Sequence, residues 1–371
     1  MAKDVDAAMI SNRQFTFILI LFITSTADVF LPSISVQLAG RDTWLAVMVA
    51  AFIASGIVLI QAELAQRFPG QPPSAYAGKL LGPLGGALFI FCYLFFLFYL
   101  TAVVIGELVQ ITNSIFFSNT PNILIVLLLT LAAGYAALLG LEVVARVIEF
   151  VFPLGLLIRI LIVAFALSDL EMIRFMPVLE HGVGPVLQSS MRITAWLGEG
   201  VILLFLAQFI KSPAAYKKSM LAAIWTVAFL LLLSSLSVGL FGSQQAADIT
   251  FSLFEIIRIL EFGGSRGFEA ILMVFWYSAT FFKVSILMII LFTTLQKITR
   301  AEATRTLLLP LILLVTILPL FLSSEVSKTL LILKNTWPGL ALTFELLLPA
   351  LLLMIGLLKK KNNRGGSQNE S

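Results

Sequence analysis

Three ionisable side chains interrupt apolar stretches that are long enough to cross a membrane, and their chemistry suits a zwitterionic ligand. Asp28 lies within TSTADVFLPS (24–33), Glu199 lies within WLGEG (196–200), and Lys283 lies in a third apolar run. Each costs about 2.5–3.5 kcal/mol at the centre of a membrane helix on insertion scales, so we expect all three to face the interior of a helix bundle. There a carboxylate can bind a ligand amine, and an ammonium group can bind a ligand carboxylate.

The same three residues have structural alternatives. Lys283 could meet a ligand carboxylate, could stand where a transporter would hold a cation, or could form an ion pair with Glu199 or Asp28. Glu199 could bind an amine, or could hold its helix by accepting backbone N–H bonds. Asp28 could likewise bind an amine or cap a half-helix. The residue types leave these alternatives open.

Both acidic residues lie where an apolar run is interrupted. The first run has three hydroxyls and Pro32 near its middle, and the sixth has two glycines. Interrupted segments at matched positions of two halves are the best sequence indication of a midplane binding site, because free backbone groups are costly in hydrocarbon unless they line a cavity or bind something. A simple kink is the alternative. We expect Thr26 to add a hydroxyl group to the site. Leu197 and Gly198 should supply the floor of the pocket and backbone groups.

Two further residues could share this site. Thr280 lies one helical turn before Lys283 and so falls on the same side of a helix. Tyr93 lies somewhat below mid-depth of the third run, where a phenol ring can contact a small ligand and donate one hydrogen bond. Because four phenylalanines lie within four residues of Tyr93, packing is the alternative for that ring.

Other ionisable residues in the apolar runs are expected to be structural. Arg159 stays charged, which rules out a proton relay through it. We expect it to pair with Glu149 or with an acid on another span. Glu345 and Glu107 are expected to be structural or hydrated.

Residue types that common catalytic and metal sites need are scarce. His181 is the one histidine and Cys92 the one cysteine, so the sequence offers no metal-binding cluster and no intrachain disulfide. Phosphate-binding, dinucleotide-binding and nucleophile-elbow motifs do not occur in a credible context. We therefore expect neither an enzyme nor a cofactor. In a membrane protein the net charge of +4 does not indicate nucleic acid, and no such partner is expected.

Long apolar runs must position the candidate residues. The 371-residue chain is 60% hydrophobic and 12% charged, and its mean hydropathy is +1.04. This composition predicts an all-α polytopic membrane protein. The ten predicted spans are 12–39, 43–67, 84–112, 121–141, 145–168, 188–211, 215–241, 268–297, 304–323 and 336–358.

We predict one transmembrane domain, residues 1–358, built from two five-span repeats at about 12–168 and 188–358, and then a disordered basic cytoplasmic tail, 359–371. Fifteen Lys and Arg residues lie on the side of the N-terminus and seven on the other, which predicts both termini inside. The tail should attract anionic lipid. The segment FSLFEIIRILE (251–261) predicts an amphipathic helix on the surface.

Several motifs occur in an order that resembles a known family. The motifs are ISNRQ (10–14), FLPS with AGRDTWL (30–45), RFPGQPPSAY (67–76), GELVQITNSIFFSNTP (106–121), FMPVLEHGVGPVLQSS (175–190), the GE of span six, and Trp276 with Lys283. With these motifs in this order, the chain resembles the B subunits of spore germinant receptors, which are permease-like members of the amino acid–polyamine–organocation superfamily, over nearly its whole length. In the first span, relatives often have small Gly-rich residues where this chain has STADV, which leaves the identity of the ligand open.

The resemblance implies a LeuT-like 5+5 inverted repeat with the first and sixth helices broken. It makes span three a wall of the ligand pocket, which adds Tyr93 to the candidate site. It also implies a nutrient sensor in the spore inner membrane, acting with receptor A and C subunits, that binds a small nutrient such as an amino acid between helices 1 and 6 and spans 3 and 8. The alternatives are a secondary amino acid permease coupled to protons or cations, and a nutrient-opened conduit for ions or water.

Overall fold

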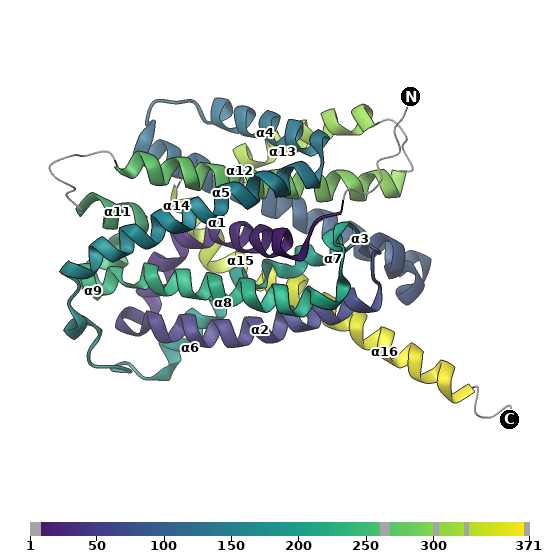
Figure 1. The fold of residues 1–371 in the computed structure, drawn as a ribbon, viewed down its shortest axis with the longest axis horizontal. Coiled ribbons are helices and arrows are strands. Elements are labelled where there is room, and N and C mark those ends of the chain that lie inside the picture. The colour runs from purple at the N-terminus through teal and green to yellow at the C-terminus, as the bar shows by residue number, and fades with distance from the viewer. Residues whose placement is uncertain (1–8, 260–267, 300–303, 323–325, 367–371) are drawn as a thin grey trace.

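Long apolar helices lie side by side along one common direction (Figure 1). The computed structural model describes residues 9–259, 268–299, 304–322 and 326–366. Within these ranges, eight segments are long and apolar enough to cross a membrane, and Leu307–Leu322 is a shorter apolar helix. Large hydrophobic side chains on the outside, such as Phe150 and Phe321, remain exposed, as the hydrocarbon of a bilayer requires. The chain is an integral membrane protein, and the predicted all-α class is confirmed.

Each predicted span coincides with one or more helices, while the division into two repeats remains a prediction. The first long segment, Asn12–Arg67, holds two helices separated by the short 3₁₀ turn Gly40–Asp42. The helices are α1 (Asn12–Ala39), α2 (Thr43–Arg67), α3 (Pro73–Ile111), α4 (Asn122–Leu139), α5 (Leu141–Ala166), α6 (Val183–Leu197), α7 (Leu203–Leu206), α8 (Tyr216–Ser235), α9 (Ser237–Phe241), α10 (Ser243–Asp248), α11 (Ser252–Ile259), α12 (Phe268–Thr299), α13 (Thr304–Leu322), α14 (Val326–Leu331), α15 (Trp337–Leu342) and α16 (Leu348–Gly366).

Helix α1 lies at the centre of the bundle and packs against α5, α6, α8 and α12. It begins with a capping box, in which the Ser11 hydroxyl accepts from the Gln14 backbone at 3.1 Å and the Gln14 side chain accepts from the Ser11 backbone at 2.9 Å. Most of its side chains are buried on every side, which is the pattern of a helix enclosed by other helices. Its polar residues therefore contact protein rather than lipid.

The two predicted interruptions differ in form. Helix α6 ends at Leu197 and gives way to the 3₁₀ segment Gly198–Ile202 before α7, so the break in span six is confirmed. Helix α1, in contrast, continues through Pro32 without a gap. The hydroxyls of Thr24 and Ser25 bond to carbonyl groups of the preceding turn, as expected for the kink alternative.

The third span starts earlier than predicted. Helix α3 begins at Pro73 rather than near residue 84, and Gly82 divides it with a φ of 77°. Glycine adopts this left-handed backbone without a side-chain clash, so the chain can turn there before it enters the long part of the helix. Tyr76 on the short first part stacks on Phe68 with 4.4 Å between ring centres.

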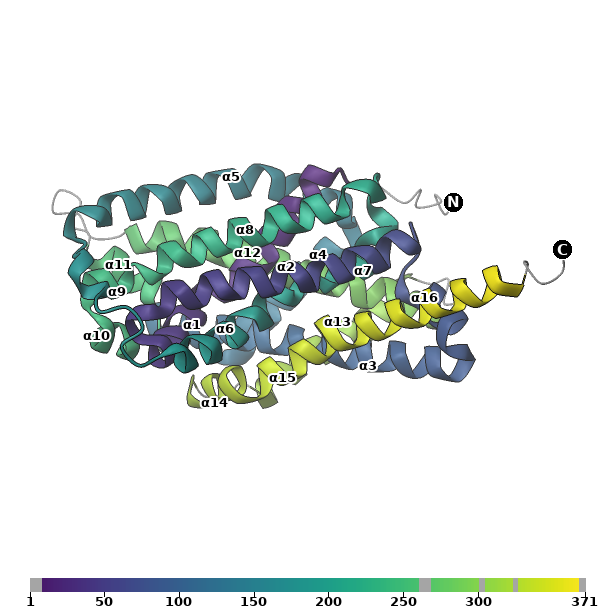
Figure 2. The same ribbon diagram turned by 90° about the horizontal axis from the view of Figure 1, so that it is seen from below.

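The C-terminal segment differs from the predicted disordered tail as far as Gly366. Helix α16 continues through residues 359–366 and extends beyond the bundle (Figure 2). Lysine is a good helix former, and Lys359 also donates to the Lys79 carbonyl at 3.0 Å, which supports the extra turns. The start of α1 and the end of α16 lie at the same end of the bundle (Figure 1).

The amphipathic helix predicted at 251–261 is confirmed over its described part. Helix α11 buries Phe254, Ile256 and Ile257 and exposes Arg258. Residues 260 and 261 lie outside the described ranges. The buried side of α11 contacts α1, α9 and α12, so this helix covers one end of the bundle.

Candidate functional site

Lys283 and Glu199 form a fully buried ion pair at the interruption between α6 and α7. The Lys283 Nζ lies 2.7 Å from Glu199 Oε2 and donates to Thr26 Oγ1, also at 2.7 Å. The same ammonium lies 4.6 Å from the centre of the Phe22 ring, within cation–π range. We call Lys283 and Glu199 the central ion pair. Of the two acids considered as partners of the lysine, the structure selects Glu199.

Three elements bring these groups together. Phe22 and Thr26 lie four residues apart and so share one side of α1. Glu199 lies in the 3₁₀ segment Gly198–Ile202, and Lys283 reaches it from α12. Because the ammonium extends from α12 and contacts both α1 and the 3₁₀ segment, a change in its partners can move the three elements relative to one another.

A second irregular segment contacts the interruption in span six. The π-helical segment Thr343–Leu347 lies between α15 and α16. Gln61 on α2 is fully buried, and its amide donates to the carbonyl oxygens of Gly198 at 3.0 Å and Glu345 at 2.8 Å. One side chain therefore joins a 3₁₀ segment to a π segment, and π segments of this kind occur frequently at functional sites.

Several buried oxygens around this junction have no hydrogen-bond partner among the described residues. They are Glu199 Oε1, Gln61 Oε1 and both carboxylate oxygens of Glu345. The Glu345 carboxylate lies directly against Gly198, where an added Cβ would overlap its Oε2 atom. Glycine is therefore required for this close approach. Buried acceptors seek donors, so the arrangement can receive an ammonium group or another hydrogen-bond donor.

The other predicted site residues are buried nearby, and their polar atoms contact the protein. The Tyr93 hydroxyl donates to the Phe344 carbonyl at 2.6 Å, which joins α3 to the π segment. The Thr280 hydroxyl donates to the Trp276 carbonyl of its own helix at 3.1 Å. Leu197 is fully buried at the end of α6. These residues form walls around the interruption.

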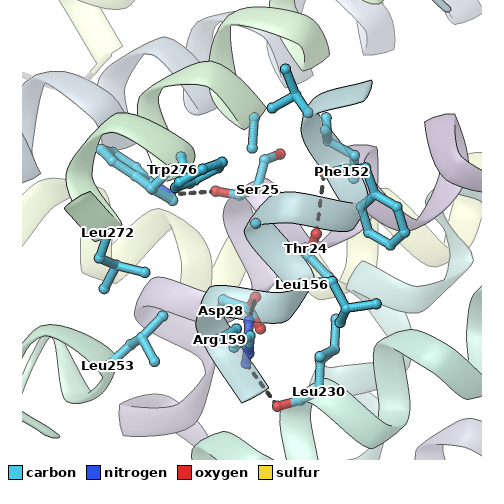
Figure 3. Close-up of a pocket in the computed structure, with 15 residues that line it drawn as sticks. Thr24, Ser25, Asp28, Phe152, Leu156, Arg159, Leu230, Leu253, Leu272 and Trp276 are labelled. Atoms are coloured by element: carbon cyan, nitrogen blue, oxygen red, sulfur yellow. Dashed lines mark hydrogen bonds and ion pairs between the residues drawn. The ribbon is translucent and has the colours of Figure 1, made fainter. Parts of the chain in front are cut away.

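Asp28 lies in a different place from the one predicted. Its carboxylate pairs with Arg159 of α5, as Figure 3 shows, and not with the central ion pair. Arg159 also donates to the Leu230 carbonyl and to the Ser234 hydroxyl of α8, both at 2.7 Å. The reason is helical geometry: Asp28 follows Thr26 by two residues, which turns its side chain by about 200° around the helix axis.

The remaining buried ionisable residues contact protein groups or are shielded from water. Arg159 pairs with an acid on another span and not with Glu149, which instead bonds to Arg13 and accepts from Gln14 at 3.0 Å. Glu107 is 2% exposed and Glu345 is fully buried, so neither side chain faces bulk water.

Gln61 was not among the residues predicted for the site. An amide in the apolar second span was a usable signal, because a polar group inside a membrane helix needs a partner. Glu345 was expected only to be structural or hydrated. Its close approach to Gly198 depends on the π segment Thr343–Leu347, and no sequence pattern indicated that segment.

Comparison with known proteins gives consistent matches along the chain. The spore permease family model, described as "Spore germination protein", matches residues 9–328. Spore germination protein KB of Bacillus subtilis (strain 168) is 27% identical over 379 residues, which cover 99% of this chain and all of that protein. Spore germination protein YndE of the same organism is 23% identical over 361 residues, which cover 96% of this chain and 98% of the relative.

A solved structure shares the fold. MHP1, a nucleobase-cation-symport-1 family transporter in a closed conformation with bromovinylhydantoin bound, matches with a TM-score of 0.62 at 15% identity, covering 91% of this chain and 78% of the other. At that identity the likeness shows the fold alone, and the LeuT-like transporter fold is confirmed. The matched proteins are germination proteins and a transporter, and none of those named here is an enzyme.

Proposed function

Because the chain belongs to the spore germination protein family, we propose that it is the nutrient-binding membrane subunit of a spore germinant receptor. The central ion pair is the observation that carries this proposal. A buried Lys and Glu at a helix interruption are costly to maintain, and ionisable residues inside a membrane protein mark ligand or ion sites by default. The proposed ligand is a small amino acid.

The ligand would exchange partners with the central ion pair. Its carboxylate would replace Glu199 at the Lys283 ammonium, and its ammonium group would bind Glu199, so that each charge keeps an opposite charge. The unpartnered oxygens of Glu345 lie beside Gly198 and would accept the remaining ammonium protons. Thr26 contributes a hydroxyl, while the four residues that form the walls are Tyr93, Leu197, Gly198 and Thr280. Asp28, which pairs with Arg159, is not part of this proposal.

Binding would signal by shifting an equilibrium between two packings of α1, the 3₁₀ segment Gly198–Ile202 and α12. The Lys283 ammonium joins α12 to the other two elements, so separating it from Glu199 would change how they pack. A ligand that moves such an equilibrium from 1:99 to 99:1 must prefer one state by about 5.5 kcal/mol. We propose that receptor A and C subunits in the spore inner membrane read this change.

Germination of spores that lack only this gene tests the proposal. Spores would be scored against single amino acids and sugars, and then complemented with the wild-type gene, Lys283→Met or Lys297→Met. Lys297 makes a matched control because it lies on the same helix, is exposed and bonds to Gln208. We expect one nutrient response to be lost, and to return with the wild type and Lys297→Met but not with Lys283→Met. A normal dose–response curve for Lys283→Met would refute the proposed site.

A secondary amino acid permease is the alternative, and the transporter fold is the observation that favours it. Uptake of radiolabelled amino acid into proteoliposomes that contain the full chain separates the two functions. Uptake driven by a proton or sodium gradient would establish transport, whereas binding without accumulation fits the receptor. Both termini would face the cytoplasm in either case, in line with the excess of Lys and Arg on that side.

A further inference from the structure

A groove lies between α3, α4 and α12, away from the central ion pair. Helices α3 and α4 both pack against α12, and the groove that the three helices form has a volume of about 530 Å³. Ligand pockets in proteins usually have volumes of roughly 300–1,000 Å³, so this groove is large enough for a ligand. We call it the α3–α4 groove, and its lining residues lie within 108–117, 120–129 and 277–281.

The rim of the α3–α4 groove faces the bilayer. Phe117, Leu124 and Leu128 line the groove, and their side chains are 53%, 47% and 62% exposed. Leu124 and Leu128 belong to α4, which is long and apolar enough to cross a membrane. Exposed apolar side chains on such a helix contact lipid, so an occupant can enter the groove from the bilayer.

The groove begins at the membrane boundary and descends into the bilayer. It starts at the turn 117–121, where Thr120 is a lining residue, between the π segment Thr112–Phe116 and α4. Irregular backbone exposed to lipid does not occur within the hydrocarbon region, so the turn marks the boundary. From Leu124 to Leu129 the lining follows α4 for five residues, about 8 Å along the helix axis. This depth corresponds to the polar interface of a bilayer and the start of its hydrocarbon.

Three of the four hydroxyl groups in the lining already donate hydrogen bonds within the protein. Thr112 donates to the Leu108 carbonyl at 2.6 Å, so Tyr277 is the donor in the hydrogen bond between the Thr112 and Tyr277 hydroxyls. Ser278 donates to the Val274 carbonyl at 2.7 Å. Water in a protein cavity is held by about two to four polar partners. Below the turn, the groove therefore suits an apolar occupant better than it suits water.

We propose that the α3–α4 groove binds one phospholipid from the leaflet at this end of the bundle. Its glycerol region lies beside Thr120 in the turn, and the first carbons of one acyl chain lie between Leu128 on α4 and Phe281 on α12. A chain in the groove contacts three helices, whereas a chain on a convex helix surface contacts one. Because lipid tails gain no hydrophobic free energy by leaving other lipid, this difference in van der Waals contact is what retains the lipid.

The bound lipid packs behind the helix that carries the lysine of the central ion pair. Ser278 and Phe281 of α12 line the groove, whereas Thr280 and Lys283 of the same helix are buried inside the bundle. An occupied groove therefore supports α12 from its lipid side. The lipid site does not depend on the nutrient proposed for the central ion pair, so each can be tested without the other.

Photolabelling of the full chain in phosphatidylglycerol nanodiscs tests the inference. The probe is a phosphatidylglycerol with a diazirine near the start of one acyl chain, so probe and host lipid share a head group. Labelled residues are mapped by mass spectrometry in the absence of nutrient. We expect Leu128 and Phe281 to carry at least about fivefold more label than Leu161 and Phe229, because a chain in the groove contacts three helices.

The two reference residues are matched by type and position. Leu161 on α5 and Phe229 on α8 are exposed, and they lie five and six residues before the ends of their helices. Leu128 lies six residues after the start of α4. Equal labelling of the groove and reference residues would overturn the proposal, and this comparison needs no variant.

Two serines provide matched variants. Ser278 lines the groove and Ser55 lies on α2 outside it; both are partly exposed, and each donates at 2.7 Å to the carbonyl four residues earlier. Ser278→Phe fills the groove and should reduce the label on Leu128 to the level of Leu161, whereas Ser55→Phe should keep the wild-type pattern. Undiminished label on Leu128 in a folded Ser278→Phe protein would contradict the assignment.

Discussion

Removing one member of the central ion pair should destabilise the protein more than removing both. In Glu199→Gln the Lys283 ammonium stays fully buried without an anion, although Thr26 and the Phe22 ring still contact it. In Lys283→Met the Glu199 carboxylate loses its one partner among the described residues. Breaking a buried pair from one side costs about 3–5 kcal/mol, whereas replacing both partners by neutral groups is often close to neutral.

The effects of the two single substitutions on the free energy of unfolding should therefore not be additive. We expect Glu199→Gln to cost about 3 kcal/mol, because two contacts to the ammonium remain, and Lys283→Met to fall nearer the upper end of the same range. The double variant should lose less than either single variant, so the two effects together exceed it by a coupling energy of at least about 4 kcal/mol. The assay is equilibrium unfolding of the four purified full-length proteins in mixed micelles with increasing sodium dodecyl sulfate, followed by tryptophan fluorescence.

Two results would refute this reasoning. If the single effects add to within about 0.5 kcal/mol, the residues do not act as a buried pair. If the double variant regains both stability and the nutrient response in spores, the pair is structural and does not bind the ligand. We expect stability to return and the response to stay lost.

Three further changes follow from the packing. Gly198→Ala places a methyl group on a buried carboxylate and should cost about 1–3 kcal/mol in the same unfolding assay, whereas Gly339→Ala, with open space at its Cβ, should match the wild type. Arg159→Met leaves a buried acid unpaired and should cost about 3–5 kcal/mol, whereas the exposed Arg146→Met should cost less than about 1 kcal/mol. Gln61→Leu removes the donor from two buried carbonyls and should cost about 1–3 kcal/mol for each; an unchanged unfolding midpoint would show that water replaces the amide.

The fold could be predicted largely from the apolar runs, because each must bury its backbone polar groups in a helix. The break at Gly198 was predictable as well, since two glycines beside an acid do not suit a helix interior. The continuity of α1 could not be predicted, because Ser and Thr hydroxyls can either mark a break or bond to the carbonyl groups of an intact helix. Helix formation through residues 359–366 is supported by a tertiary contact, from Lys359 to the Lys79 carbonyl, which the local sequence does not indicate.

The residue types in the candidate site could be predicted from the sequence, but the direction in which each side chain points could not. Thr26, Glu199 and Lys283 meet as expected. Asp28 does not join them, because which side of α1 faces which neighbour depends on how the whole bundle packs. Arg159 illustrates the same limit: its long side chain can reach acids on several spans, and only the packing of α5 against α1 selects one.

The two hydrogen bonds of Gln61 have a consequence for local opening. One buried amide, that of Gln61, bonds to both the 3₁₀ segment Gly198–Ile202 and the π segment Thr343–Leu347. A segment that rearranges therefore loses its hydrogen bond to the side chain that also holds the other segment. Segments tied in this way open as one cooperative unit. Backbone amides in the two segments should then exchange with deuterium at matched rates, although 140 residues separate them in sequence. In Gln61→Leu those rates should diverge, as each segment acquires its own opening equilibrium.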